Sequence, residues 1–472
     1  MTPPTESLPQ ESKGLESEAL GFFSVLTVGV SSVAPAYSLS AVLGPIVAVV
    51  GLHAPLVIVV AVVPMLLVAV GAQQLNAART DCGTVFTWAG AAVGPRFGWL
   101  AGWLMLIADI IAGAALAQVA GSYAMRVLGL PESTVGTTAG GAACLVLVGT
   151  LCLFRVEWSA RAQRVMLGCE LAVLLLFAIA ALVEAPHLEP AVTEHAPASL
   201  STGTAAEAGL LAVYLYAGWD GCMNLNEETR HRRKWPGIAA LVALVVVGGV
   251  YALVAVAGLR FRSPEFFADA ANVADVLGAL APEVLGPRAK WLMTVAVLIS
   301  SIAGAQVVIL AGARTLLAMG AAGAIPSRFA RVDPRRKTPT TATLVAVASS
   351  LVVFCALAWT SEAVAREAVM ASSLCIALYY AAIGFSSPLL FRARMFESPR
   401  RFVRVALAPG LGALAFLWVC EETIRGAMAR AGRVPMGLWL AVGLLGLGVA
   451  VMILRRVGST HAREGAAAAD GD

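Results

Sequence analysis

Three carboxylates stand inside long apolar stretches of the sequence, where charged side chains are rare. Asp220 lies in the segment YLYAGWDGCMNLNEET (residues 214–229) with glycines on both sides, and Asp109 and Glu170 lie within two other apolar stretches. Lipid cannot solvate a carboxylate, and the glycines weaken the helix that should satisfy the backbone. Such an acid is kept where it lines a cavity and binds a cation or a proton, or where it hydrogen-bonds to a neighbour in a glycine-rich helix contact.

The composition around these acids is that of an integral membrane protein. Of the 472 residues, 59% are apolar and only 13% are charged, and the mean hydropathy is +0.82. A soluble domain carries about 25% charged residues. The net charge is only +4, and the basic residues form short clusters between apolar stretches without interleaved aromatic residues, which argues against nucleic-acid binding.

Cysteine and histidine are too scattered to form a catalytic or metal centre. The eight cysteines include no CxxC pair and no metal or disulfide spacing, and the five histidines lie near loops or tails. Without a nucleophile–base pair or a metal cluster in the apolar stretches, we expect no enzyme activity, no cofactor and no metal site. The polar groups also cluster at one depth instead of repeating along a pore, which argues against a channel.

About twelve apolar stretches follow one another along the chain, each about 20 residues long, which is the length that crosses a bilayer as a helix. If the N-terminus is cytoplasmic, most of the arginines and lysines fall in loops on the cytoplasmic side, as positive-inside topology requires. With an even number of spans, both termini are then cytoplasmic. We therefore expect an all-α, multi-pass protein of the plasma membrane.

The first and the sixth apolar stretches are each interrupted near the middle. The first (residues 20–50) contains Pro35, which removes a hydrogen-bond donor, and the sixth (residues 205–227) contains Asp220. Taken alone, Pro35 is equally consistent with a simple kink, but two breaks five spans apart indicate two five-helix repeats of inverted topology. The expected divisions are a disordered tail (1–18), the first repeat (19–184), an extracellular loop (185–204), the second repeat (205–391), two accessory helices (392–456) and a second disordered tail (457–472).

Broken helices expose backbone groups that bind charged ligands. Free carbonyls at a helix end suit an ammonium group or a metal ion, and free N–H groups suit a carboxylate. A site with both is built for a zwitterion such as an amino acid. The candidate substrate-binding residues lie at the two breaks and in the third span: Ser31, Ser32, Val33, Ala34, Tyr37, Asp109, Tyr216, Ala217, Gly218, Trp219 and Asp220.

Two longer segments carry a recognisable pattern of glycine, acidic and basic residues: YAGWDGCMNLNEETRHRRKWP and SSIAGAQVVILAGARTLLAMGAAGAIPSRFARVDPRRKTP. They resemble the sixth span, and the eighth span with its following loop, of the amino acid–polyamine–organocation permeases. The resemblance covers most of residues 20–391. It implies the five-plus-five inverted-repeat fold with broken helices 1 and 6, plus two accessory C-terminal helices. It also implies a secondary active transporter that moves amino acids or related amines, by symport with an ion or by exchange.

The sequence departs from that family pattern in two places. The first break reads VSSVAP (residues 30–35) where the family usually has a Gly-Ser-Gly-like element, and the fifth span has Glu170 where some proton-coupled relatives carry a lysine. We expect a proton as the coupling ion, because buried carboxyl groups can take it up and release it. Sodium is the alternative, and its oxygen ligands would come from two serines of the eighth span with first-span carbonyls. The candidate ion-coupling residues are Asp109, Glu170, Ser300 and Ser301.

An inner gate is expected where the sixth span ends. Glu227 and Glu228 precede a basic loop and either pair with Arg314 or remain an exposed pair beside solvated charges. The expected function is transport of a small-molecule substrate by alternating access, with a proton or sodium and the lipid bilayer as further partners. The alternatives are an amino acid/polyamine exchanger and a transport-silent membrane sensor with the same fold. The sequence leaves the oligomeric state open.

Overall fold

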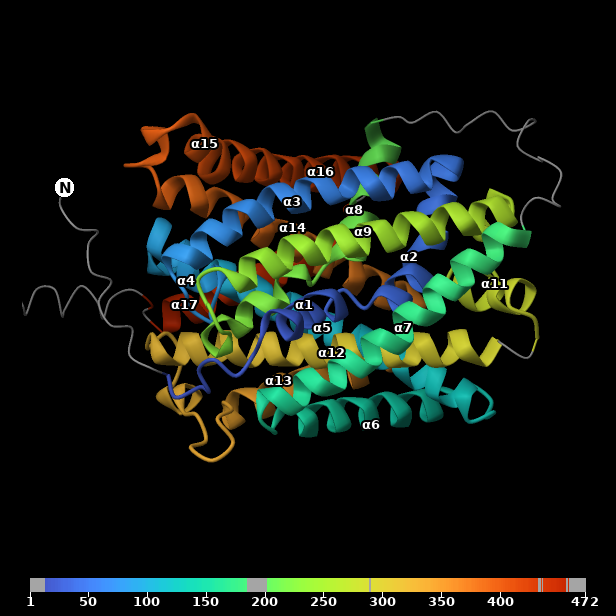
Figure 1. Ribbon diagram of the computed structural model, residues 1–472, viewed down its shortest axis with the longest axis horizontal. Coiled ribbons are helices and arrows are strands. Elements are labelled where there is room, and N and C mark those ends of the chain that lie inside the picture. Colours follow the sequence, from blue (N-terminus) through green and yellow to red (C-terminus); the bar gives the residue numbers. More distant parts are fainter. Residues whose placement is uncertain are drawn as a thin grey trace, which may run out of the picture.

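The computed structural model describes residues 13–184, 202–287, 290–431, 434, 436–455 and 457. In these residues the chain is built from helices, most of which run along the longest axis of the molecule (Figure 1). The one strand-like feature described is an isolated parallel bridge between Leu20 and Thr229. The expectation of an all-α protein is confirmed.

The first half of the chain forms six long elements and two short ones. The first span is split into α1 (Phe22–Ser31) and α2 (Pro35–Val50). The elements that follow are η1 (Gly51–His53), α3 (Ala54–Ala78), α4 (Val85–Ala92), α5 (Pro95–Val127), α6 (Thr134–Cys152) and α7 (Val156–Glu184).

The second half of the chain also begins with a span that is split into two helical segments. The sixth span consists of α8 (Thr202–Tyr216) and the 3₁₀ helix η3 (Trp219–Glu228). The later long helices are α9 (Trp235–Phe261), α12 (Lys290–Ala321), α13 (Thr340–Ala358), α14 (Glu362–Leu390), α16 (Ala408–Ala431) and α17 (Met436–Leu454). Short elements join them: α10 (Pro264–Ala268), α11 (Val276–Val284), η4 (Ser327–Ala330), η5 (Met395–Glu397), α15 (Pro399–Phe402) and the π-helical η6 (Val403–Leu407).

Ten helical stretches in the described part of the chain are long and apolar enough to cross a membrane. The first of them, Phe22–Ala78, contains α1, α2 and α3 and therefore holds two spans. The broken pair α8 and η3 is not one of the ten and adds another span. The total agrees with the count of about twelve made from the sequence, and it confirms a multi-span membrane fold with broken first and sixth helices.

The outer surface of the helix bundle is apolar. Large aliphatic side chains such as Val59, Ile179, Val352 and Ile453 are each at least 49% exposed, although they lie within long helices. An apolar surface of this extent is stable in lipid and not in water. The polar side chains described below are instead turned inward.

Local residue chemistry explains both breaks. In the first, Ala34 has a left-handed backbone (φ 48°), and Pro35 begins α2 without an N–H group to offer to α1. In the second, Gly218 has φ 103°, a value that glycine adopts without a steric penalty. Glycine is needed there for a second reason, because a Cβ atom on Gly218 would lie 2.6 Å from the carbonyl oxygen of Ser32. The two breaks are therefore in direct contact.

Candidate functional site

Asp220 is held at the second break by two tyrosines of α14. Its Oδ1 accepts hydrogen bonds from Tyr380 Oη (2.9 Å) and Tyr379 Oη (3.4 Å), and its side chain is buried. Tyr380 Oη also accepts a bond from the Gly218 N–H (3.1 Å), and its ring packs on Trp219 with 5.3 Å between the centroids. The tyrosine pair thus fixes both the acid and the break beside it.

Asp109 approaches the same region from α5. Its Oδ2 is buried and has no hydrogen-bond partner among the described residues. It lies 3.9 Å from the position that a Cβ atom would take if Gly312 of α12 were replaced by a larger residue. The carboxyl groups of Asp109 and Asp220 are close enough to interact electrostatically. Two acids from different helices therefore face one interior region, and one of their oxygens is free to bind a cation or a proton.

Glu170 connects α7 to the first break. Its Oε1 accepts hydrogen bonds from the Ala36 N–H (2.7 Å) and from Ser300 Oγ (2.6 Å), and the side chain is fully buried. Ser300 Oγ in turn accepts a bond from the Tyr37 N–H (3.2 Å). Ser301 is separate from this group, since its hydroxyl donates to the Val297 carbonyl of its own helix (2.8 Å). The structure thus brings Glu170 and Ser300 together, and leaves Ser301 out.

The other side chains expected at the breaks differ in their hydrogen-bond partners. Ser31 Oγ is buried without a partner among the described residues, and Ser32 Oγ donates to the Gly29 carbonyl (2.8 Å). Tyr37 and Tyr214 share a hydrogen bond between their hydroxyls (3.0 Å). Tyr216 points away from the breaks and donates to the Ile58 carbonyl of α3 (2.9 Å). Val33, Ala34 and Ala217 form the turns themselves.

A buried ion pair lies where η3 ends. Arg314 Nε donates to Glu228 Oε2 (2.8 Å), and its NH2 group donates to Glu228 Oε1 (2.9 Å), so the pair is bidentate. Both side chains are buried to within 1% of their surface. Of the two acids expected to meet Arg314, only Glu228 does so, and Glu227 turns to another partner.

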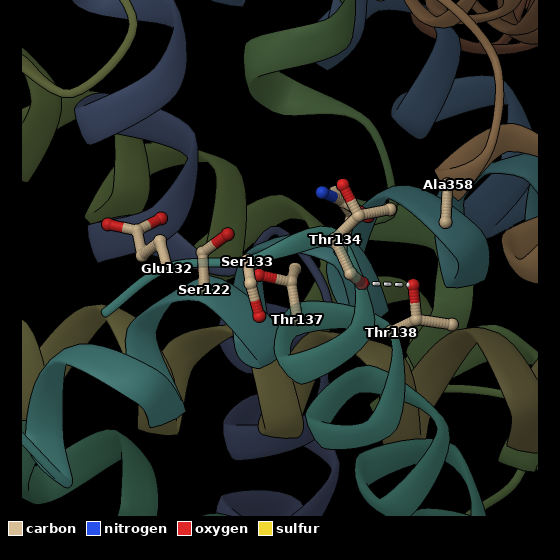
Figure 2. Close-up of a pocket in the computed structure, with 8 residues that line it drawn as sticks. Ser122, Glu132, Ser133, Thr134, Thr137, Thr138 and Ala358 are labelled. Carbon is tan, nitrogen blue, oxygen red and sulfur yellow. Dashed lines mark hydrogen bonds between the residues drawn. The ribbon is translucent and has the colours of Figure 1, made fainter. Parts of the chain in front are cut away.

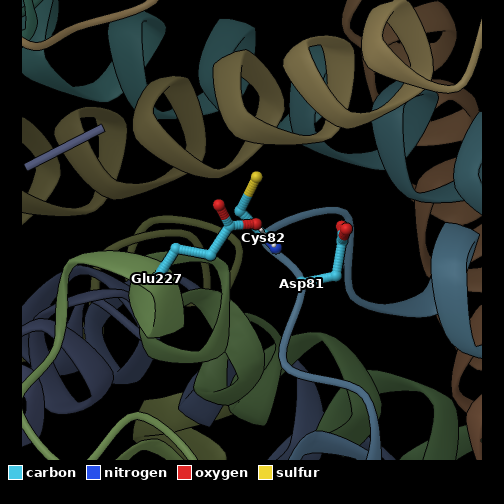
Figure 3. Close-up of side chains that lie close together, drawn as sticks. All are labelled: Asp81, Cys82 and Glu227. Carbon is cyan, nitrogen blue, oxygen red and sulfur yellow. Dashed lines mark hydrogen bonds between the residues drawn. The ribbon is translucent and has the colours of Figure 1, made fainter. Parts of the chain in front are cut away.

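That partner is Lys13, which belongs to the segment before the first helix. Lys13 Nζ lies 2.6 Å from Glu227 Oε1 and 2.6 Å from Asp81 Oδ2. Cys82 is beside them, and its N–H donates to Glu227 Oε1 (2.9 Å). Figure 3 shows the three side chains Asp81, Cys82 and Glu227 converging from two segments far apart in the sequence. We call Lys13, Asp81 and Glu227 the lysine cluster.

The lysine cluster perturbs two side chains outside the spans. Burial on its own would lower the pKa of Lys13, but Cys82, Asp81 and Glu227 raise it, and the net shift is upward. Burial also raises the pKa of the Cys82 thiol well above its usual range, against the opposing effect of Lys13. Both groups are therefore protonated at neutral pH. Oxygen and sulfur atoms in such a group can bind a metal ion, but the lysine ammonium already lies between the two carboxylates and neutralises one of their two charges.

Sequence reasoning missed four of these residues. Tyr379 and Tyr380 form the only adjacent tyrosine pair in the chain, and that pairing inside an apolar span was the available signal. Lys13 and Asp81 gave no such signal, because each lies in a polar segment that only the folded chain brings together. Residues 13–18, which the sequence assigns to a disordered tail, have defined contacts, including an ion pair between Glu16 and Arg155.

A polar pocket lies elsewhere, at the start of α6. Figure 2 shows Ser122, Glu132, Ser133, Thr134 and Thr138 around it, and Ala358 at its edge. Its lining comes from α5, α6, the loop between them and the end of α13, and none of the residues at the two helix breaks takes part. It is therefore separate from the site formed by the breaks.

Comparison with known proteins agrees with this architecture. A family model described as amino acid permease matches residues 20–453. An uncharacterized transporter of Mycobacterium tuberculosis (strain ATCC 25618 / H37Rv) is 27% identical over 455 residues, which is 94% of this chain and 93% of the relative. The Asc-type amino acid transporter 1 of Mus musculus is 27% identical over 270 residues, or 54% of this chain and 50% of the relative.

A human relative, the large neutral amino acids transporter small subunit 2, is also 27% identical, over 271 residues that make up 54% of this chain and 50% of the relative. These relatives are transporters and not enzymes. The family match runs from the start of the first broken helix through the second and on to the last helix. With its multi-span helical fold and its two helix breaks in contact, the chain belongs to the amino acid permease family.

Proposed function

We propose that the protein is a secondary active transporter that carries amino acids or related amines across the plasma membrane by alternating access. The contact between the two helix breaks at Gly218 and Ser32 is the observation that carries this proposal. It puts backbone carbonyls and buried acids together in the interior of an otherwise apolar bundle. A polar site of this kind at the interface of two repeats suits a small charged substrate.

Asp220 and Asp109 are the proposed partners of the substrate's ammonium group. The tyrosines of α14 orient Asp220, and Asp109 Oδ2 has no protein partner among the described residues. A buried carboxylate is stable when a cation or hydrogen bonds compensate its charge. A bound ammonium would provide that compensation, and the substrate would be held by charge and by carbonyl oxygens together.

Glu170 is the proposed proton-coupling residue. It joins α7, α2 and α12 through the Ala36 N–H and Ser300 Oγ, so a change in its charge would act directly on the first break. Its Oε2 is buried without a partner in the described structure, which leaves a place for a proton. A sodium ion is the other candidate, because Ser300 and Glu170 provide two of the oxygens that such a site needs.

The lysine cluster and the Arg314–Glu228 pair are the proposed inner gate, with both termini in the cytoplasm. Together they tie η3 to α12, to the loop before α4 and to the N-terminal segment. Opening toward the cytoplasm would require these contacts to separate. A buried ion pair is stable only in one geometry, so its contacts are either made or broken. Such a gate would therefore have two discrete states, closed and open.

The test is uptake of labelled amino acids and amines into proteoliposomes that contain the purified full-length protein. Uptake should rise as the external pH falls, and it should be unaffected when choline replaces sodium. Collapse of uptake in choline at fixed pH would assign the coupling to sodium. Uptake driven only by substrate on the opposite side would identify an exchanger. Binding of substrates without any flux would identify a sensor and overturn the proposal of transport.

A further inference from the structure

The N-terminus of α2 is already occupied by groups of the protein itself. The N–H groups of Val33 and Ala34 donate to the Val30 and Ser31 carbonyls, Pro35 has none, and the Ser38 N–H donates to the Ala34 carbonyl. The two that remain in the first turn belong to Ala36 and Tyr37, and they donate to Glu170 Oε1 and Ser300 Oγ. Every backbone donor from the break through the first turn of α2 is thus accounted for.

A helix N-terminus inside a membrane protein is the natural binding place for a substrate carboxylate, because its N–H groups and dipole attract negative charge. Here the buried Glu170 carboxylate takes that place. A substrate carboxylate would have to displace the Glu170 side chain. Beside an ionised Glu170 it would also meet the repulsion of a like charge in a medium of low dielectric constant.

The N-terminus of η3 is also occupied by groups of the protein itself. Asp220 lies in its first turn, and the preceding Gly218 N–H donates to Tyr380 Oη. An acid in the first turn compensates the positive end of a helix dipole. Both half-helices that begin at the breaks therefore carry a protein carboxylate where a zwitterionic substrate would put its own.

The charges around the breaks are also unbalanced. Arg314 is the only basic side chain among the buried polar residues of the described structure, and it is paired with Glu228. None of the ion pairs described involves Asp109, Glu170 or Asp220. The carbonyl ends of α1 and α8 face the same breaks and add negative partial charge. The site therefore suits positive charge, and the buried described residues include no unpaired basic side chain that could neutralise an anion.

We propose that the site takes organic amines whose carboxyl group is absent or masked, and that Glu170 is the residue that excludes free amino acids. The inference rests on the transport function proposed above and narrows its substrate class. The expectation of a zwitterionic substrate assumed free N–H groups at the first break. Those N–H groups are instead bonded to Glu170 and Ser300, so the basis for that expectation is absent.

The experiment compares each amino acid with its decarboxylated partner on the purified full-length protein. Suitable pairs are lysine and cadaverine, ornithine and putrescine, tyrosine and tyramine, and serine and ethanolamine, with lysine methyl ester as a carboxyl-masked probe. Ligand affinity is read from the rise in melting temperature with ligand concentration, and transport from uptake into proteoliposomes. In at least one pair the amine should bind about tenfold more tightly than its parent amino acid. Lysine methyl ester should bind better than lysine.

Variants of Glu170 test the assigned residue. Glu170→Gln keeps the side-chain oxygen but removes the charge, and Glu170→Ala frees the Ala36 N–H of α2. Both variants should shift the preference about tenfold toward the amino acid. Glu157→Gln, on the same helix but at its first turn, should leave the preference as it is. If Glu170→Ala does not fold, Glu170→Gln still shows whether the charge of Glu170 sets the preference for the amine.

The outcomes separate this inference from the proposed function. Tighter binding and transport of the parent amino acids would overturn the inference and leave the transport function standing. An unchanged preference in the Glu170 variants would overturn the role of that residue. If no member of any pair binds or is transported, the proposed function fails, and this inference fails with it.

Discussion

Arg314 of α12 and Glu228 of η3 form two parallel hydrogen bonds, of 2.8 and 2.9 Å, in the interior of the protein. Both side chains are buried, so each charge is compensated by the other and by nearby polar atoms. The Leu310 carbonyl, 3.4 Å from Arg314 NH1, is one of these atoms. The pair therefore holds the end of the sixth span against the eighth in a single geometry.

Removing one partner of this pair should strongly destabilise the protein. Glu228→Gln leaves the Arg314 charge buried and uncompensated, and such a loss costs about 3–5 kcal/mol. The double variant Arg314→Met with Glu228→Leu removes both charges and should recover much of the lost stability. The measurement is the melting temperature of the purified protein in detergent. If the double variant were as unstable as Glu228→Gln, the destabilisation would have a cause other than the unpaired charge.

Loss of Lys13 should open the inner face near Cys82. The Cys82 thiol is fully buried and lies 3.5 Å from Lys13 Nζ. In Lys13→Ala the two carboxylates repel each other without a counter-charge, so the N-terminal segment should separate from them and Cys82 should react faster with maleimide. Cys169, which is exposed, is replaced by serine beforehand to reduce background labelling. The exposed Lys234 provides the control, since Lys234→Ala should leave the labelling rate unchanged.

The lysine cluster should not respond to pH in the physiological range. The pKa of Lys13 is raised in the folded protein, so its stabilising contribution is fully present below the ordinary lysine pKa of about 10.4. The contribution is lost only as the pH rises through the higher folded value. The thiolate is the reactive form, so the Cys82 labelling rate is divided by that of a free thiol at the same pH. This ratio should stay low and constant from pH 6 to 8 in the wild-type protein. A steep rise of the ratio within that interval would show that the cluster opens by titration.

Substitution of Gly218 should disrupt the contact between the breaks. Gly218→Ala puts a methyl group 2.6 Å from the Ser32 carbonyl oxygen and forces a side chain onto a backbone with φ 103°. Strain of this kind costs about 1–3 kcal/mol, and the two breaks must move apart to relieve it. Gly249→Ala is the matched control, because nothing lies within 4 Å of its added methyl group. Transport should be lost in the first variant and retained in the second.

Asp220→Asn tests the amine partner directly. The asparagine oxygen can still accept bonds from Tyr379 and Tyr380, so the fold should be retained while the negative charge disappears. Amine binding should weaken about tenfold or more, as expected for the loss of a charge-assisted hydrogen bond. The affinity is measured by competition in proteoliposomes, and the exposed Asp269→Asn serves as the control. Equal affinity and rate in Asp220→Asn would rule out Asp220 as the amine partner.

The fold could be predicted because it follows from local patterns. The apolar stretches have the length of membrane spans, and Pro35 and Gly218 mark the two breaks by backbone chemistry alone. The partners at the site could not be predicted in the same way. Whether the N–H groups of α2 are free depends on Glu170, which lies 134 positions further along the chain from Ala36.

The serines of α12 also show that contact partners cannot be predicted from local sequence. Ser300 and Ser301 are neighbours in sequence with the same chemistry, yet only Ser300 faces Glu170, because successive helical residues point about 100° apart. Similarly, the sequence places two acids at the end of η3, but it does not say which of them Arg314 will meet. Side-chain direction and long-range contacts decide these points, and both are properties of the folded chain.

The lysine cluster has a consequence for how this part of the sequence can change during evolution. Its three charges come from segments around positions 13, 81 and 227, and the lysine contacts both acids at once. A substitution that removes the lysine leaves two close carboxylates, and one that removes an acid leaves only a simple pair. We expect the three positions to covary among related sequences, with loss of the lysine accompanied by loss of at least one acid. A lineage in which both acids persist without a basic residue would need another cation between them.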